Sequence, residues 1–171
     1  LLRGMPARLI LPPVKLPAAH TPVRAGRVGV LLVNLGSPDA PDVPAVKRFL
    51  REFLSDPRVI EIPQFLWQPI LNLLILNIRP RTTAANYAKV WLPEGSPITV
   101  YTRAQAEALQ ARLGDGVMVE WAMRYGTRTI GEGLTGLMKA GCDRILLAPL
   151  YPQYSAATNA TVVDEAARVL G

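Results

Sequence analysis

Cysteine and histidine are scarce in this chain of 171 residues. Its one cysteine, Cys142, cannot form an internal disulfide, and its one histidine, His20, lies in a proline-rich N-terminal segment. Residues 27–171 therefore lack the base that a Ser/His/Asp or Cys/His catalytic system needs, and a metal cluster of His and Cys is excluded. Cys142 precedes an apolar segment, so we expect it to be a small buried residue in a protein of a reducing compartment.

Long apolar runs and blocks of basic residues are also missing. The most apolar stretch, residues 70–78, is interrupted by Asn72 and Asn77, so we expect no membrane-spanning helix and a cytoplasmic protein. The formal net charge is +6, but no run of five basic residues occurs, which disfavours nucleic-acid binding. A scattered basic surface suits anionic small molecules or the approach to an acidic membrane surface.

The glycine-rich loops that cradle phosphates are absent. The first apolar run is followed by NLGSPD rather than G-x-G-x-x-G, and no Walker A sequence is present. The carboxylates show no metal-like grouping at the ends of the predicted strands. We therefore expect neither a dinucleotide nor a resident metal ion.

What is present is a regular alternation of strand and helix patterns. Near-continuous apolar runs at residues 28–35, 117–123 and 144–150 predict strands buried on both faces. Thr102 with Gln105, and Thr129 with Glu132, predict capping boxes that begin two of the helices between them. This order predicts an α/β, Rossmann-like three-layer fold with a parallel sheet, incomplete at three visible strands. Residues 1–26 are expected to form a poorly ordered arm.

Residues 63–78, PQFLWQPILNLLILNI, are apolar on nearly every side of a predicted helix. Such a helix is typical of a fully buried core element. The alternative is an exposed apolar lip, because a small sheet domain has limited interior. A lip could accept a flat apolar ligand or contact a membrane.

Polar and aromatic residues follow the predicted strands at the edge where parallel α/β sheets bind ligands. The first strand leads to Leu35, the second to Arg124 and Tyr125, and the third to a loop with Tyr151 and Ser155. The alternative interpretation of Arg124 and Tyr125 is a purely structural pair that holds a loop in place. The segment between the first two strands adds a second group, which comprises Arg79, Tyr87 and Ser96. Arginine binds carboxylates bidentately and aromatic rings stack on flat ligands, so this composition suits a planar, acidic, largely apolar molecule.

At these residues the chain resembles ferrochelatases, which insert ferrous iron into a porphyrin. The resemblance runs through VGVLLVNLGSPDAP, FLSDPRVIEIP, IRP, NYAKVW, EGSPI, AMRYG and LYPQYSAAT, and it covers residues 27–171. It implies that these residues form the N-terminal Rossmann-like domain of a two-domain enzyme, with a second domain absent from the chain. It also implies that the substrates are protoporphyrin IX and Fe²⁺. For residues 63–78 it favours the exposed apolar lip rather than the fully buried core helix.

The resemblance implies a role for each candidate residue. Arg79 would pair with a porphyrin propionate, and Tyr87 and Ser96 would complete that edge of the pocket. Arg124 and Tyr125 would form the floor, with Tyr151 and Ser155 along the same wall. Leu35 stands where members that use coproporphyrin have tyrosine, which favours protoporphyrin.

The resemblance also implies what this chain does not supply. Ala156 stands where animal members place an iron–sulfur ligand, so no cluster is expected. The family's catalytic histidine lies in the second domain, so residues 1–171 alone are expected to be inactive and to contain no catalytic residue. Two alternatives stay open, namely a non-catalytic tetrapyrrole-binding module and a cobalt chelatase acting on a corrin precursor.

Overall fold

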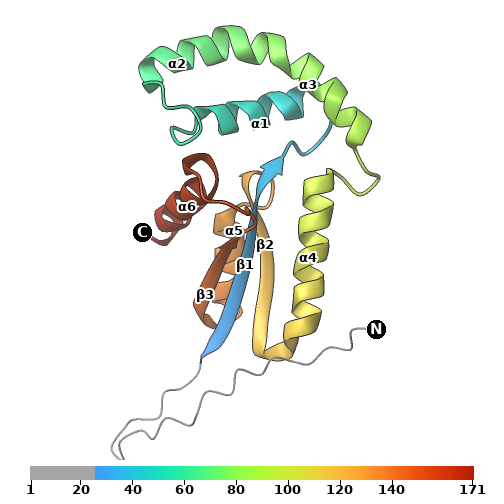
Figure 1. Ribbon diagram of the computed structural model, residues 1–171, viewed down its shortest axis with the longest axis vertical. Coiled ribbons are helices and arrows are strands. Elements are labelled where there is room, and N and C mark those ends of the chain that lie inside the picture. Colours follow the sequence, from blue (N-terminus) through green and yellow to red (C-terminus); the bar gives the residue numbers. More distant parts are fainter. Residues whose placement is uncertain (1–25) are drawn as a thin grey trace, which may run out of the picture.

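The computed structural model describes residues 26–171, so the predicted arm at residues 1–26 lies outside the described residues except for Gly26. Three parallel strands form the sheet in the order β2-β1-β3 (Figure 1). They are β1 (Arg27–Ser37), β2 (Val117–Gly126) and β3 (Cys142–Pro149). The predicted α/β class and parallel sheet are confirmed, and β1 and β2 extend beyond their apolar runs because both pair out to Ser37 and Gly126.

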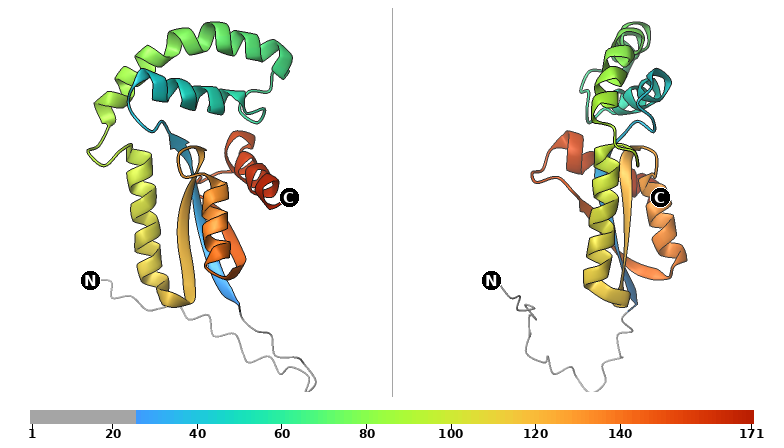
Figure 2. Two further views of the ribbon diagram at one scale, coloured as in Figure 1. Left: turned by 180° about the vertical axis from the view of Figure 1, so that it is seen from behind. Right: turned by 90° about the vertical axis from the view of Figure 1, so that its right-hand side faces the viewer.

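The strand β1 is central because its side chains are apolar on both faces. Leu31 and Val33 are fully buried on one face, and Val30 and Leu32 pack on the other. Figure 2 shows one helix layer on each side of the sheet. Cys142, at the start of β3, belongs to the first of these cores, which confirms that it is a buried cysteine.

Within residues 26–171, six α-helices connect and cover the strands. They are α1 (Val43–Ser55), α2 (Gln64–Ile70), α3 (Leu76–Val90), α4 (Pro97–Leu113), α5 (Ile130–Lys139) and α6 (Thr161–Leu170). A π-helical turn, Leu71–Ile75, joins α2 to α3, a second, Ala156–Ala160, precedes α6, and a 3-10 turn, Gly114–Gly116, follows α4. Helices α5 and α6 pack with one face of β1, and α4 covers the other. Helices α1 to α3 lie beyond the carboxyl ends of the strands (Figure 1).

The two predicted capping boxes have different outcomes. The box at Thr129 and Glu132 is confirmed, with both reciprocal hydrogen bonds present at the start of α5. The start predicted at Thr102 is wrong, because α4 begins at Pro97 and the side chain of Ser96 caps it. Thr102 lies buried inside α4, where its hydroxyl accepts a hydrogen bond from Asn34 Nδ2 at 3.1 Å. Proline is favoured in the first turn of a helix, and an extended serine before it supplies the cap.

The apolar helix predicted at residues 63–78 is two-sided. Leu71 and Leu76 are buried against the end of α1. Six other large apolar side chains of this segment are exposed by 44% to 77%: Phe65, Leu66, Ile70, Leu73, Leu74 and Ile78. We call these six residues the apolar face. The segment is therefore partly a core element and partly an exposed lip, because only one side of it meets α1.

Candidate functional site

The carboxyl ends of the three strands meet at one edge of the sheet, and α1 to α3 form a layer beyond that edge. This is where parallel α/β sheets bind ligands. A cavity of about 490 Å³ opens there between the end of α1, the end of β2 and the first turns of α6. Of the candidate residues named from the sequence, Arg124 and Tyr125 line this cavity.

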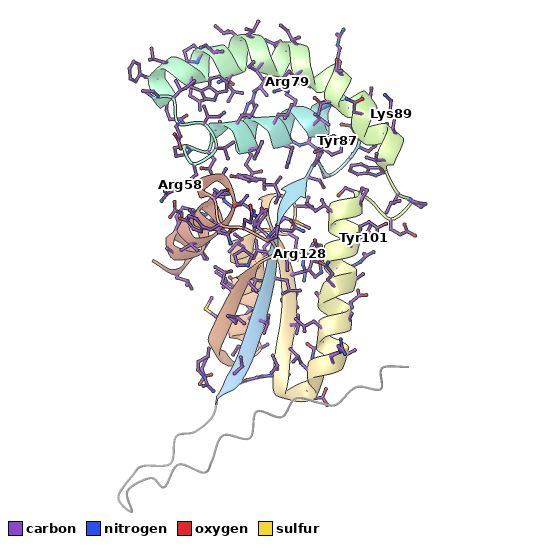
Figure 3. The ribbon with its side chains drawn as sticks, viewed as in Figure 1. Arg58, Arg79, Tyr87, Lys89, Tyr101 and Arg128 are labelled. Atoms are coloured by element: carbon purple, nitrogen blue, oxygen red, sulfur yellow. The ribbon has the colours of Figure 1, made fainter. Side chains whose placement is uncertain are left out.

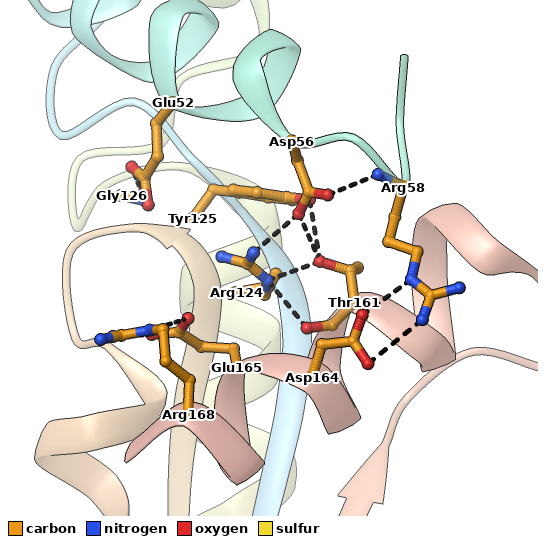
Figure 4. A network of polar contacts seen from close by, with 10 residues as sticks. All are labelled: Glu52, Asp56, Arg58, Arg124, Tyr125, Gly126, Thr161, Asp164, Glu165 and Arg168. Atoms are coloured by element: carbon orange, nitrogen blue, oxygen red, sulfur yellow. Dashed lines mark hydrogen bonds and ion pairs between the residues drawn. The ribbon is translucent and has the colours of Figure 1, made fainter. Parts of the chain in front are cut away.

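Asp56, the C-cap residue that follows α1, is the centre of a polar network in this cavity (Figure 4). Its Oδ2 accepts hydrogen bonds from Arg124 Nη2 at 2.7 Å, Tyr125 OH at 2.8 Å and Thr161 Oγ1 at 2.5 Å. Its Oδ1 accepts a fourth from the backbone N–H of Arg58 at 2.7 Å. The network therefore joins the helical layer, the sheet and α6 through one carboxylate.

Burial and hydrogen bonding act in opposite directions on Asp56, which is only 8% exposed. Burial alone would raise its pKa, since it disfavours the charged form. The hydrogen bonds from Thr161, Tyr125 and Arg58 and the charge of Arg124 outweigh burial and hold the pKa of Asp56 below its ordinary value. The carboxylate is therefore ionised at neutral pH and forms a charge-assisted pair with Arg124.

Tyr125 is held on three sides. It is 1% exposed, its ring makes an edge-on contact with Phe53, and the Arg124 guanidinium lies 4.4 Å from its centroid. Burial raises the pKa of its hydroxyl far above the ordinary value, so it stays a neutral donor to Asp56. The pair Arg124 and Tyr125 thus ties the end of β2 to α1 and α6, as the structural interpretation of this pair predicts.

Surface ion pairs border the network. Arg58 binds Asp164 of α6 at 2.7 Å, and Arg168 binds Glu165 at 2.6 Å (Figure 4). The Glu52 carboxylate accepts a hydrogen bond from the backbone N–H of Gly126 at 2.9 Å. Exposed pairs of this kind contribute little stability, so the buried Asp56 network is the stronger link between these elements.

Arg79 and Tyr87 both lie on α3, in the layer beyond the sheet (Figure 3). Arg79 is exposed, and within the described residues its side chain makes no hydrogen bond or ion pair. Tyr87 is half-buried with its ring edge-on to Trp91, and burial raises its pKa. Arg79 therefore presents an available guanidinium directly after Ile78, the last residue of the apolar face.

Ser96 and Leu35 lie where β1 ends and α4 begins. The Ser96 hydroxyl is 2.5 Å from Ser37 Oγ and 2.9 Å from Thr99 Oγ1, and the residue is 3% exposed. Ser96 is thus bound within a buried hydroxyl cluster as well as capping α4. Leu35 is half-buried near the end of β1.

Tyr151 and Ser155 belong to the loop after β3. The Tyr151 ring packs against the core beneath α5 and α6, and its buried hydroxyl has no hydrogen-bond partner among the described residues. Burial raises the pKa of Tyr151 to about 12, against a smaller opposing effect of the Arg124 charge. Ser155 is exposed, and its hydroxyl is 2.7 Å from Thr158 Oγ1.

The structure therefore brings Arg124 and Tyr125 together directly and places the charge of Arg124 within influence of Tyr151. The other candidates lie around the same edge without direct contacts to that pair. Sequence reasoning missed Asp56 and Thr161, which hold the pair in place. Asp56 precedes Pro57, which marks it only as the end of a helix, and its separation of 105 residues from Thr161 leaves no local pattern to find.

Two further properties concern the described residues as a whole. No helix among residues 26–171 combines the length and apolar character needed to cross a bilayer. In the same part of the chain, no three His, Cys, Asp or Glu side chains gather as a metal ion would require.

A parallel α/β domain with a polar and aromatic cavity at the carboxyl edge of its sheet belongs to the Rossmann-like class of ligand-binding domains. Comparison with known proteins identifies the family: the model of the ferrochelatase family matches residues 27–171, and the chain belongs to that family.

Two relatives illustrate the similarity. A ferrochelatase of Azoarcus sp. (strain BH72) is 54% identical over 155 residues, which cover 90% of this chain and 43% of the relative. A ferrochelatase of Bradyrhizobium sp. (strain BTAi1) is 58% identical over 159 residues, which cover 91% of this chain and 44% of the relative. The chain thus spans less than half the length of these relatives.

Proposed function

We propose that this chain is the porphyrin-holding part of an enzyme that inserts ferrous iron into protoporphyrin IX to form protohaem, the last step of haem biosynthesis. The observation that carries the proposal is the position of the apolar face, which is followed along the same helical segment by the available guanidinium of Arg79. A porphyrin is flat and largely apolar and carries two carboxylates. An exposed apolar surface beside a cation matches it, and the family supports the substrate class.

The candidate residues have proposed roles on this surface. Arg79 binds a propionate, with Tyr87 and Ser96 at the same edge. Arg124 and Tyr125 form the floor of the porphyrin pocket, and Tyr151 and Ser155 lie along the same wall. These residues complete the set proposed to hold porphyrin. Leu35 supplies an apolar contact where a hydroxyl would favour a more acidic porphyrin, which supports protoporphyrin as the substrate.

The chain's own residues hold and orient the macrocycle, and we propose that residues 27–171 do not complete the reaction. Removal of protons from the pyrrole nitrogens requires a general base near them. The sole histidine, His20, lies outside the described residues, and the family resemblance assigns the base to a second domain. Iron is a substrate in this proposal, with no permanently bound cofactor or iron–sulfur cluster.

Porphyrin binding tests the proposal directly. The chain is titrated with mesoporphyrin IX, and binding is followed by the porphyrin absorption band. We expect Arg79→Ala to weaken binding about tenfold, the usual cost of one charge-assisted hydrogen bond. Arg103→Ala, at an exposed arginine of α4, is the matched control and should bind as the wild type does. Absence of binding, or equal losses in both variants, would contradict the proposal.

An iron-insertion assay tests the second part. With Fe²⁺ and mesoporphyrin IX present, we expect the 171-residue chain to bind the porphyrin without forming the metalloporphyrin. Turnover by the chain alone would contradict the assignment of proton removal to another domain. The absorption spectra of free and metallated porphyrin distinguish the two results.

We further propose that the apolar face contacts a membrane surface at the periphery. Its six side chains form an exposed apolar surface larger than single scattered residues provide, and the positive net charge favours an acidic bilayer. Co-sedimentation with phosphatidylglycerol vesicles measures the contact. Leu73→Ser should reduce binding several-fold, whereas Val163→Ser, at a 53% exposed valine of α6, should not. Equal binding by all three proteins would exclude the contact.

A further inference from the structure

Arg124 is fixed by two different kinds of contact. Its Nε donates to the Thr161 carbonyl oxygen at 3.1 Å and to Thr161 Oγ1 at 2.7 Å, and its Nη2 donates to Asp56. The guanidinium carbon Cζ also lies over the Tyr125 ring, 4.4 Å from its centroid. Hydrogen bonds at two nitrogens and an aromatic ring against its centre together restrict the orientation of the guanidinium.

This arrangement leaves one end of the guanidinium available. Within the described residues Nη1 makes no hydrogen bond, and Figure 4 shows the corresponding terminal nitrogen without a dashed line, pointing away from Asp56 and Thr161. The Arg124 side chain is 15% exposed and lines the cavity of about 490 Å³. The hydrogen bonds therefore select which N–H groups of Arg124 can reach a ligand.

We propose that Asp56, acting with Thr161, is a positioning residue that aims the Nη1 donor of Arg124 at the porphyrin. The inference rests on the proposed function, since it specifies how one wall of that site is built. Asp56 also belongs to the segment that joins α1 to the apolar face, so the same carboxylate fixes the helical layer relative to β2 and α6.

Positioning and simple charge attraction predict opposite effects for Asp56→Asn. Neutralising Asp56 leaves Arg124 as an uncompensated cation near a dicarboxylate ligand, so charge attraction alone would strengthen binding. If orientation is what matters, loss of the charge-assisted bond frees the guanidinium and binding weakens. Asp39→Asn, which removes an exposed Asp–Arg pair with Arg48, is the matched control.

The test measures mesoporphyrin IX affinity for the full 171-residue chain in a double-mutant cycle. We expect Asp56→Asn and Arg124→Ala each to weaken binding about tenfold, and the double variant to be no weaker than Arg124→Ala. We also expect the absorption band of the bound porphyrin to shift in the same way in both single variants, whereas Asp39→Asn matches the wild type. Additive losses, or stronger binding by Asp56→Asn, would overturn the positioning role.

A second pair of variants keeps the test valid if Asp56→Asn does not fold. Thr161→Ser retains the hydroxyl that bridges Asp56 and Arg124, and Thr161→Val removes it at nearly constant volume. We expect wild-type affinity for the first and a several-fold loss for the second. Equal affinity in both would overturn the proposal while leaving the proposed function intact, whereas failure of the wild-type chain to bind porphyrin would overturn both.

Discussion

A Cβ atom added to Gly36 would lie 2.0 Å from the backbone oxygen of Tyr125, on the neighbouring strand. Gly36 also adopts a φ of +102°, a conformation that side chains other than glycine rarely adopt. We therefore expect Gly36→Ala to lower the free energy of unfolding by more than about 2 kcal/mol, because it combines a backbone collision with strain. Urea denaturation measures the change.

Gly136, on the exposed side of α5, is the control for that substitution. A Cβ there would have no neighbour within 4 Å, and the residue lies inside a regular helix. We expect Gly136→Ala to raise the free energy of unfolding by about 0.5–1 kcal/mol, since alanine loses less conformational freedom in a helix. If both substitutions destabilised the protein equally, the close approach of β1 and β2 at Gly36 would not be the cause.

Asp56 should make the stability of the protein depend on pH in the acid range. Its pKa in the folded protein is lowered from 3.8, so its contribution is present above that value and is lost as the pH falls through the folded pKa. Asp56→Asn should cost about 1–3 kcal/mol at pH 7.

Urea denaturation at pH 7 and at pH 3 measures this contribution. The difference in unfolding free energy between wild type and Asp56→Asn should shrink at the lower pH, because Asp56 of the unfolded wild-type chain takes up a proton there and asparagine does not. A difference that stays constant would show that the Asp56 charge does not contribute. Asp39→Asn, at an exposed pair, should change stability by less than about 1 kcal/mol at either pH.

Ser96 should matter for stability apart from any contact with porphyrin. Ser96→Ala removes the cap of α4 and leaves the buried Ser37 hydroxyl without its partner at 2.5 Å, so we expect a loss of about 1–2 kcal/mol. Ser155→Ala, at an exposed serine, should cost less than about 0.5 kcal/mol. Thermal unfolding of both variants checks the difference, and equal melting temperatures would argue against a structural role of the Ser96 cluster.

The parts of the fold that depend on neighbouring residues could be predicted from the sequence. The apolar run of β1 marks a strand buried on both faces, and the spacing of Thr129 and Glu132 marks the start of α5. The same reasoning failed at Thr102, because its spacing to Gln105 imitates a capping box. The helix begins earlier because Ser96 followed by Pro97 is a stronger start signal, and Thr102 then lies inside α4, where it accepts a hydrogen bond from Asn34.

The candidate site shows the same division between local and distant information. Arg124 and Tyr125 follow β2 directly, so their place at the sheet edge follows from the strand pattern. Their orientation does not, because it is set by Asp56, which lies 68 residues from Arg124. The two-sided nature of the apolar helix was likewise beyond prediction, since the helix is apolar all round and only packing against α1 distinguishes its faces.

Tyr151 and Tyr125 provide the last test, because their buried hydroxyls differ in one respect. Tyr125 donates to Asp56, whereas the Tyr151 hydroxyl has no partner within residues 26–171. Removing the Tyr125 hydroxyl takes one of several hydrogen bonds from the buried Asp56 carboxylate, whereas removing an unpaired buried hydroxyl relieves a desolvation cost. We therefore expect Tyr125→Phe to lower the free energy of unfolding by about 1.5–3 kcal/mol and Tyr151→Phe to leave it unchanged or raise it by up to about 1 kcal/mol.

Tyr151 should contribute to mesoporphyrin binding even though its hydroxyl contributes nothing to the free energy of unfolding. Its pKa of about 12 keeps the phenol protonated at neutral pH, so it can donate a hydrogen bond to a ligand. Tyr151→Phe should then weaken porphyrin binding several-fold without any loss of stability, which separates a ligand contact from a structural one. Loss of stability greater than about 1 kcal/mol in Tyr151→Phe would instead show that the hydroxyl is satisfied in the folded protein, for example by a bound water.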